Sequence, residues 1–159
     1  MSKSMTTALG VGFGCLLWSL ASTLAAFPAW MGFVGCTAYF AAGGGKTGVL
    51  KALCSNWTGI FWAMGVILLY GTGPLQNATV SLVVGALAVG FIAWIMTYQS
   101  KINVLENVPC TFMGCFSTFA AGGDWKILLI GVTIGVGLGF TCDYSGRYFH
   151  RLWGTPETT

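Results

Sequence analysis

Long apolar runs, separated by short polar stretches, recur along the whole chain. Their approximate bounds are 6–27, 28 to the glycines at 43–45, 47–70, 78–97, 109 to the glycines at 122–123, and 126–142. A helix needs about 20 apolar residues to cross the hydrocarbon core of a bilayer. The pattern therefore predicts an all-α polytopic membrane protein with six transmembrane helices, of which the second and the fifth are short or broken.

The two short segments could instead be re-entrant hairpins, but the basic residues favour full crossings. With six crossings and a cytoplasmic N-terminus, only Lys126 lies outside, and the other cations lie at or near the cytoplasmic side: Lys3, Lys46, Lys51, Lys101, Arg147 and Arg151. This distribution follows the positive-inside rule, whereas re-entrant hairpins would move Lys46 and Lys51 outside. Both termini are therefore expected in the cytoplasm, with residues 143–159 forming a polar cytoplasmic tail.

An internal repeat divides the chain into two related halves. Residues 33–44 (FVGCTAYFAAGG) match residues 112–123 (FMGCFSTFAAGG) without a gap, at a constant offset of 79. Because each half has an odd number of spans, the halves must lie in opposite orientations across the bilayer. The sequence thus predicts one transmembrane domain, 1–159, built from two inverted three-helix repeats at about 6–70 and 78–142. Paired short segments in such repeats are where transporters place their binding sites.

Three motifs support a resemblance to a known family. They are residues 32–41 (GFVGCTAYFA), 108–114 (VPCTFMG) and 122–126 (GGDWK). Over most of its length the chain resembles the YcdZ-like family of small bacterial inner-membrane proteins. The resemblance implies a bacterial inner (cytoplasmic) membrane. The family is a domain of unknown function, so no binding or catalytic residue can be transferred from it.

The composition supports the bilayer as the main partner and argues against several functions. Of the 159 residues, 55% are hydrophobic and only 7% are charged, whereas soluble domains carry about 25% charged residues. The net charge of +3 is too small and too scattered for nucleic-acid binding. The six cysteines form no close CxxC pair, so we interpret them as small buried hydrophobes and expect neither a metal nor another cofactor.

The apolar segments carry no central Asp, Glu, Lys, Arg or His. Ion-coupled pumps usually place such residues inside the membrane. No nucleophile has a plausible neighbouring base, so we do not expect an enzyme. The one histidine, His150, lies beside Arg147 and Arg151, where we interpret it as an interfacial residue near anionic lipid.

Glycines at helical spacing predict close helix packing. Small residues at this spacing let two backbones approach. The candidates are Gly10, Gly14, Gly35, Gly114, Gly131, Gly135 and Gly139. The partner helix could belong to the same chain or to a second copy, and we expect a homo-oligomer because one small subunit has little room for a wide pore.

The paired short segments and the third segment supply the candidate pore-lining or solute-lining residues. Hydroxyls and an amide could bind a polar solute, and aromatic rings could exclude hydrated ions. The candidates are Phe33, Thr37, Tyr39, Phe40, Asn56, Trp57, Phe112, Ser117, Thr118 and Phe119. The alternative for each is ordinary helix packing, with the hydroxyls bonded to their own helix.

These features lead to one functional hypothesis and two alternatives. The first is a channel or facilitator for a small neutral polar solute of the urea, amide, short-alcohol or ammonia class. The second is an alternating-access carrier or exporter that uses the same paired segments as gates. The third is a non-transporting protein that assembles with a membrane partner.

Overall fold

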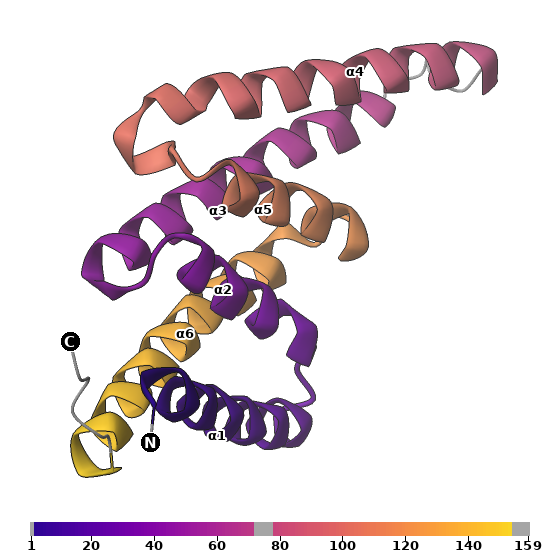
Figure 1. Ribbon diagram of the computed structural model, residues 1–159. Coiled ribbons are helices and arrows are strands. Elements are labelled where there is room, and N and C mark those ends of the chain that lie inside the picture. The colour runs from indigo at the N-terminus through magenta and orange to yellow at the C-terminus, as the bar shows by residue number, and fades with distance from the viewer. Residues whose placement is uncertain (1, 72–77, 154–159) are drawn as a thin grey trace.

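The computed structural model is all-helical over the residues that it describes, 2–71 and 78–153 (Figure 1). The α-helices are α1 (Lys3–Leu24), α2 (Ala29–Ala41), α3 (Gly45–Tyr70), α4 (Ala78–Tyr98), α5 (Val108–Ala120) and α6 (Trp125–Trp153). Two 3₁₀ turns, η2 (Gln99–Lys101) and η3 (Asn103–Leu105), connect α4 to α5. The predicted polar connection at residues 71–77 lies outside the described residues, except for Gly71.

Four of these helices are long and apolar enough to cross a membrane, namely α1, α3, α4 and α6. Helices α2 and α5 have 13 residues each, about 20 Å of helix, which is shorter than the hydrocarbon core. The six predicted segments therefore all appear as helices, and the second and fifth are the short ones. One boundary differs: α6 continues beyond Cys142 to Trp153, so residues 143–153 form helix rather than an irregular tail.

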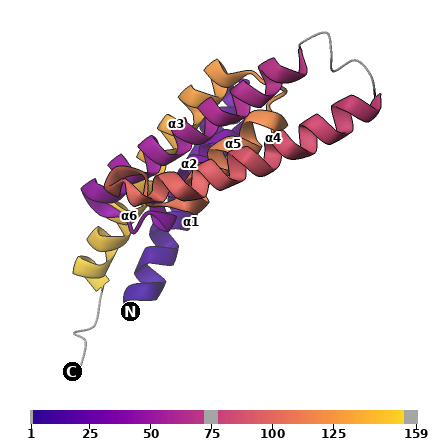
Figure 2. The same cartoon turned by 90° about the horizontal axis from the view of Figure 1, so that it is seen from above.

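Each short helix packs on the last long helix of the other half. The most extensive contact of α2 is with α6, and that of α5 is with α3. The outer helices lie on the flanks, α1 along α6 and α4 along α3 (Figure 1). Followed along the colour scale in Figures 1 and 2, α3 and α6 run in opposite directions.

Glycines bring these helices into backbone contact. A methyl group on Gly35 of α2 would meet the carbonyl oxygen of Val132 and the Cα of Gly135 on α6. A methyl group on Gly114 of α5 would meet the carbonyl oxygen and the Cα of Asn56 on α3. Gly35 and Gly114 are 79 residues apart, and so are Asn56 and Gly135, so the two central contacts are equivalent under the offset of the sequence repeat.

The remaining predicted packing glycines also lie at contacts within the chain. Gly10 and Gly14 of α1 face Cys142 of α6, and a methyl group on either would collide with it. Gly131 and Gly139 are covered by Cβ atoms of α2, from Met31 and Tyr39. Because glycine has no Cβ, these helices approach closely enough to replace side-chain contacts with backbone contacts.

The turns that end the two short helices have the same backbone path. Gly43 and Gly44 have φ values of +86° and +68°, and Gly122 and Gly123 have +63° and +87°. The N–H of Gly44 donates to the Tyr39 carbonyl at 3.1 Å, and the N–H of Gly123 donates to the Thr118 carbonyl at 3.0 Å. Residues other than glycine rarely adopt a positive φ, so the repeated Gly-Gly is a requirement of this turn.

Candidate functional site

The centre of the molecule contains buried polar side chains on α3 and α5. Asn56, Ser117 and Thr118 are fully buried, as is Ser55 beside Asn56. Asn56 donates from Nδ2 to the Ala52 carbonyl at 2.9 Å, and Thr118 donates to the Gly114 carbonyl at 2.8 Å. Three of these four residues, Asn56, Ser117 and Thr118, are predicted lining residues, and they lie inside the subunit close to the α3–α5 contact.

Some of these polar atoms have no partner. Among the described residues, the buried side-chain atoms without a hydrogen bond are Ser55 Oγ, Asn56 Oδ1, Ser117 Oγ and His150 Nδ1. The first three lie within one turn of the Asn56–Gly114 contact, because Ser117 is three residues from Gly114, about 4.5 Å along the helix. A buried polar group without a partner costs about 1–3 kcal/mol. The atoms could be satisfied by water or by a polar solute.

The other candidate lining residues lie at the outer surface of the single chain. Side chains of Trp57, Phe112 and Phe119 are about two-fifths exposed, and Thr37 and Phe40 are exposed on α2. Thr37 donates to the carbonyl of Phe33 on its own helix at 2.8 Å, and Phe33 is half-buried. In a single subunit these residues face lipid, and they could line a path only where two subunits meet.

Tyr39, another predicted lining residue, is buried and belongs to a polar cluster at one end of the bundle. Its side chain is fully buried, and its hydroxyl donates to Asp143 Oδ2 at 2.7 Å and accepts from the Gly45 N–H at 2.7 Å. Arg147 holds the same carboxylate with two nitrogens, Nη2 at 2.7 Å and Nε at 3.1 Å. The cluster ties the α2–α3 turn to α6.

A second polar cluster lies between α3, η2 and α5. The Gln99 side-chain oxygen accepts from Trp62 Nε1 at 3.1 Å. Its nitrogen donates to Thr58 Oγ1 at 3.1 Å and to Thr111 Oγ1 at 3.4 Å. One amide therefore satisfies polar groups on two helices.

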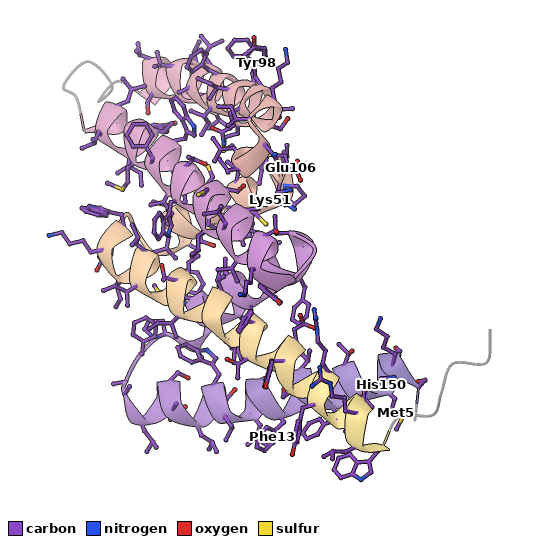
Figure 3. All side chains as sticks on the ribbon, turned by 90° about the vertical axis from the view of Figure 1, so that its left-hand side faces the viewer. Met5, Phe13, Lys51, Tyr98, Glu106 and His150 are labelled. Carbon is purple, nitrogen blue, oxygen red and sulfur yellow. The ribbon has the colours of Figure 1, made fainter. Side chains whose placement is uncertain are left out.

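A surface ion pair holds the start of α5 against α3. Lys51 Nζ lies 2.5 Å from Glu106 Oε1, and Figure 3 shows the two side chains meeting between α3 and the connection that precedes α5. Asn107 adds a second tie by donating from Nδ2 to the Ala41 carbonyl at 2.7 Å. The end of α2 and the starts of α3 and α5 are thus brought together.

Sequence reasoning missed Asp143, Gln99 and Ser55. Asp143 and Arg147 are spaced i, i+4, a signal that favours continued helix with an internal ion pair over an irregular tail. Gln99 sits in a polar connection and gave no signal of its own. In the described part of the chain, no group of three or more His, Cys, Asp or Glu side chains could hold a metal ion.

The long apolar helices and the buried short ones define the class of this molecule, an all-helical membrane protein. The chain belongs to the family described as "Protein of unknown function (DUF1097)", which matches residues 8–147. The resemblance seen in the sequence motifs is thereby confirmed.

Curated relatives agree with this assignment. The chain is 32% identical over 149 residues to "Inner membrane protein YcdZ" of Escherichia coli K12, which covers 93% of this chain and 88% of the relative. It is 31% identical to the protein of the same name in Salmonella typhimurium LT2, covering 93% and 90%. It is 27% identical to "Uncharacterized protein YahC" of Escherichia coli K12, covering 92% and 93%. No solved structure matches the chain.

Proposed function

We propose that the protein is a channel or facilitator for a small neutral polar solute, of the urea, amide, short-alcohol or ammonia class. The observation that carries the proposal is the group of unpartnered polar atoms of Ser55, Asn56 and Ser117 at the α3–α5 contact. They offer one amide oxygen, which accepts hydrogen bonds, and two hydroxyls, which accept or donate. Such a set binds a neutral solute without requiring a charge in the membrane.

The arrangement of the helices supports the proposal. The equivalent contacts Gly35–Gly135 and Gly114–Asn56, and the opposite directions of α3 and α6, are those expected of two inverted repeats (Figure 2). In transporters built in this way the substrate site lies where the repeats meet. The polar atoms lie at one of these two central contacts.

The proposed orientation places both termini in the cytoplasm. The Lys51–Glu106 ion pair joins α3 to the connection before α5, and the Tyr39–Asp143 hydrogen bond joins α2 to α6. These contacts support a common end for the cations that the positive-inside rule assigns to the cytoplasm. In a background with the six native cysteines replaced by alanine, an impermeant maleimide applied to intact spheroplasts should label Lys126→Cys and leave Ser2→Cys unlabelled. The opposite labelling would reverse the orientation.

Flux measurements test the function. Purified protein in liposomes is mixed with urea, acetamide, glycerol or ammonia, and stopped-flow light scattering follows volume recovery, with empty liposomes as the control. We expect rapid flux of one solute class that does not saturate with concentration. Saturation and counterflow would instead identify a carrier, and flux equal to that of empty liposomes from folded protein would reject the channel.

A pair of variants locates the path. Asn56→Leu keeps the branching and the number of side-chain heavy atoms and removes the amide, so flux should fall at least severalfold if the path runs inside the subunit. Thr37→Val changes an exposed position on α2 and is the matched control. Loss of flux in Thr37→Val with normal flux in Asn56→Leu would move the path to an interface between subunits.

A further inference from the structure

A basic cavity lies between the beginning of α1 and the end of α6. None of its lining residues belongs to the proposed solute path. Its volume is about 400 Å³. It is lined by Lys3, Thr6, Thr7, Asp143, Gly146, Arg147, His150 and Arg151. Close packing of Gly146 against the backbone of Thr6 and Thr7 fixes the floor of the cavity, because a methyl group at Gly146 would collide with Thr7.

Among the described residues, the cavity carries more positive than negative charge. Its one carboxylate, Asp143, already accepts from two nitrogens of Arg147 and from the Tyr39 hydroxyl. Within the described residues, the ion pairs are Lys51–Glu106 and Arg147–Asp143, so Lys3 and Arg151 have no carboxylate partner there. Arg147 and Arg151 are four residues apart on one helical face, where like charges repel unless an anion lies between them.

The histidine of the cavity also lacks a partner. His150 Nδ1 is buried and makes no hydrogen bond. Figure 3 shows His150 near the end of α6, beside the start of α1. A protonated imidazole nitrogen in this position can donate a hydrogen bond to an anionic oxygen. Lys3 and Arg151 cannot accept that hydrogen bond, because their side chains carry donors only.

The surroundings of the cavity resemble the boundary between lipid and water. Tyr144, Tyr148 and Trp153 are exposed near the end of α6, and tyrosine and tryptophan gather at the headgroup level of membrane proteins. On α1, the exposed apolar side chains Met5 and Phe13 belong to a stripe that also includes Leu9, at a spacing of four residues (Figure 3). An acyl chain can lie along this stripe while its headgroup reaches the cavity.

We propose that the cavity binds the phosphate group of an anionic phospholipid. Lys3, Arg147 and Arg151 supply positive charge, His150 supplies a directed donor, and the α1 stripe receives an acyl chain. Basic pockets between transmembrane helices on the cytoplasmic side are known to recognise anionic headgroups. The site is independent of the proposed solute path and goes beyond it.

The test is native mass spectrometry of the full-length protein in detergent, with phosphatidylglycerol, phosphatidylcholine or inorganic phosphate added separately. We expect phosphatidylglycerol to remain bound in preference to phosphatidylcholine. Arg151→Gln and Lys3→Gln should each lower the retention of phosphatidylglycerol about fivefold, the effect of one surface cation. Lys126→Gln is the matched control, since it removes one exposed cation at the opposite end of α6 and should have no effect.

Three results would overturn the site. One is equal retention of phosphatidylglycerol and phosphatidylcholine. Another is an equal loss in Lys126→Gln, which would mean that overall charge is responsible. The third is displacement of the lipid by millimolar inorganic phosphate, which would make free phosphate the ligand. Thermal unfolding of each variant checks that the fold is intact, and the Lys3→Gln variant provides a second test if Arg151→Gln does not fold.

Discussion

The hydroxyl of Tyr39 donates a 2.7 Å hydrogen bond to the carboxylate of Asp143, although the two residues are 104 positions apart. The same hydroxyl accepts from the Gly45 N–H at the start of α3, and the same carboxylate binds Arg147. One buried phenol therefore links α2, α3 and α6 at the end of the bundle where the cations gather.

Tyr39→Phe should destabilise the protein. The variant keeps the ring and leaves the Gly45 N–H without its acceptor, which should cost about 1–3 kcal/mol of unfolding free energy. Thermal unfolding in detergent measures the effect as a lower Tm. Tyr144→Phe is the control, because Tyr144 is largely exposed, and its Tm should stay near that of the wild type. Equal Tm values for both variants and the wild type would mean that the hydrogen bonds of the Tyr39 hydroxyl do not contribute to stability.

Gly135→Ala should also lower the Tm, whereas Gly137→Ala should not. A methyl group at Gly135 would meet the carbonyl oxygen of Gly32, and forcing it in should cost about 1–3 kcal/mol. Gly137, two residues away on the same helix, has open space around it, and alanine there gains up to about 1 kcal/mol of helix propensity. If the Tm changes by the same amount in both variants, α2 and α6 do not approach each other as closely as described.

Gln99→Ala should loosen the contact of α3 with α5. It removes the acceptor of Trp62 Nε1, which is then left unpaired at a cost of about 1–3 kcal/mol. It also removes the donor to Thr58 Oγ1, although the Thr58 hydroxyl keeps its bonds to its own helix. Hydrogen exchange in the first turns of α5 should rise together with the fall in Tm. Thr97→Ala is the control, because Thr97 is exposed and bonds only to Ala93 of its own helix.

Ser117→Ala separates a structural from a functional role of the unpaired hydroxyl. The position that corresponds to Ser117 in the first half is Ala38, which is also fully buried, so alanine fits this environment. We expect an unchanged or higher Tm, because an unpaired buried polar group is removed. Solute flux should nevertheless fall severalfold. Unchanged flux would remove Ser117 from the proposed path, and Thr141→Ala on the exposed face of α6 serves as the control.

Particular residues show why part of the interior escaped sequence reasoning. The repeat places Tyr39 opposite Thr118 and suggested similar roles, yet Thr118 bonds within its own helix and Tyr39 reaches across to α6. Thr37, Phe40 and Phe119 are predicted lining residues, but sequence pattern does not say whether a helix face meets lipid, a neighbouring helix or a pore. Gln99 lies in a connection whose path depends on contacts that no local pattern encodes.

By itself, the sequence determined the membrane class, the six helices, the two short segments and the packing role of the glycines. This was possible because backbone N–H and C=O groups in the hydrocarbon core must form hydrogen bonds within the protein, which favours helices. Hydropathy, Gly-Gly turns and the spacing of small residues are also local signals in the sequence. Only the tertiary structure decided which helices touch, that Asp143 lies in an extended α6, and which buried polar atoms lack partners. Those properties arise from contacts between residues far apart in the chain, and side-chain partners exist only once the helices are packed.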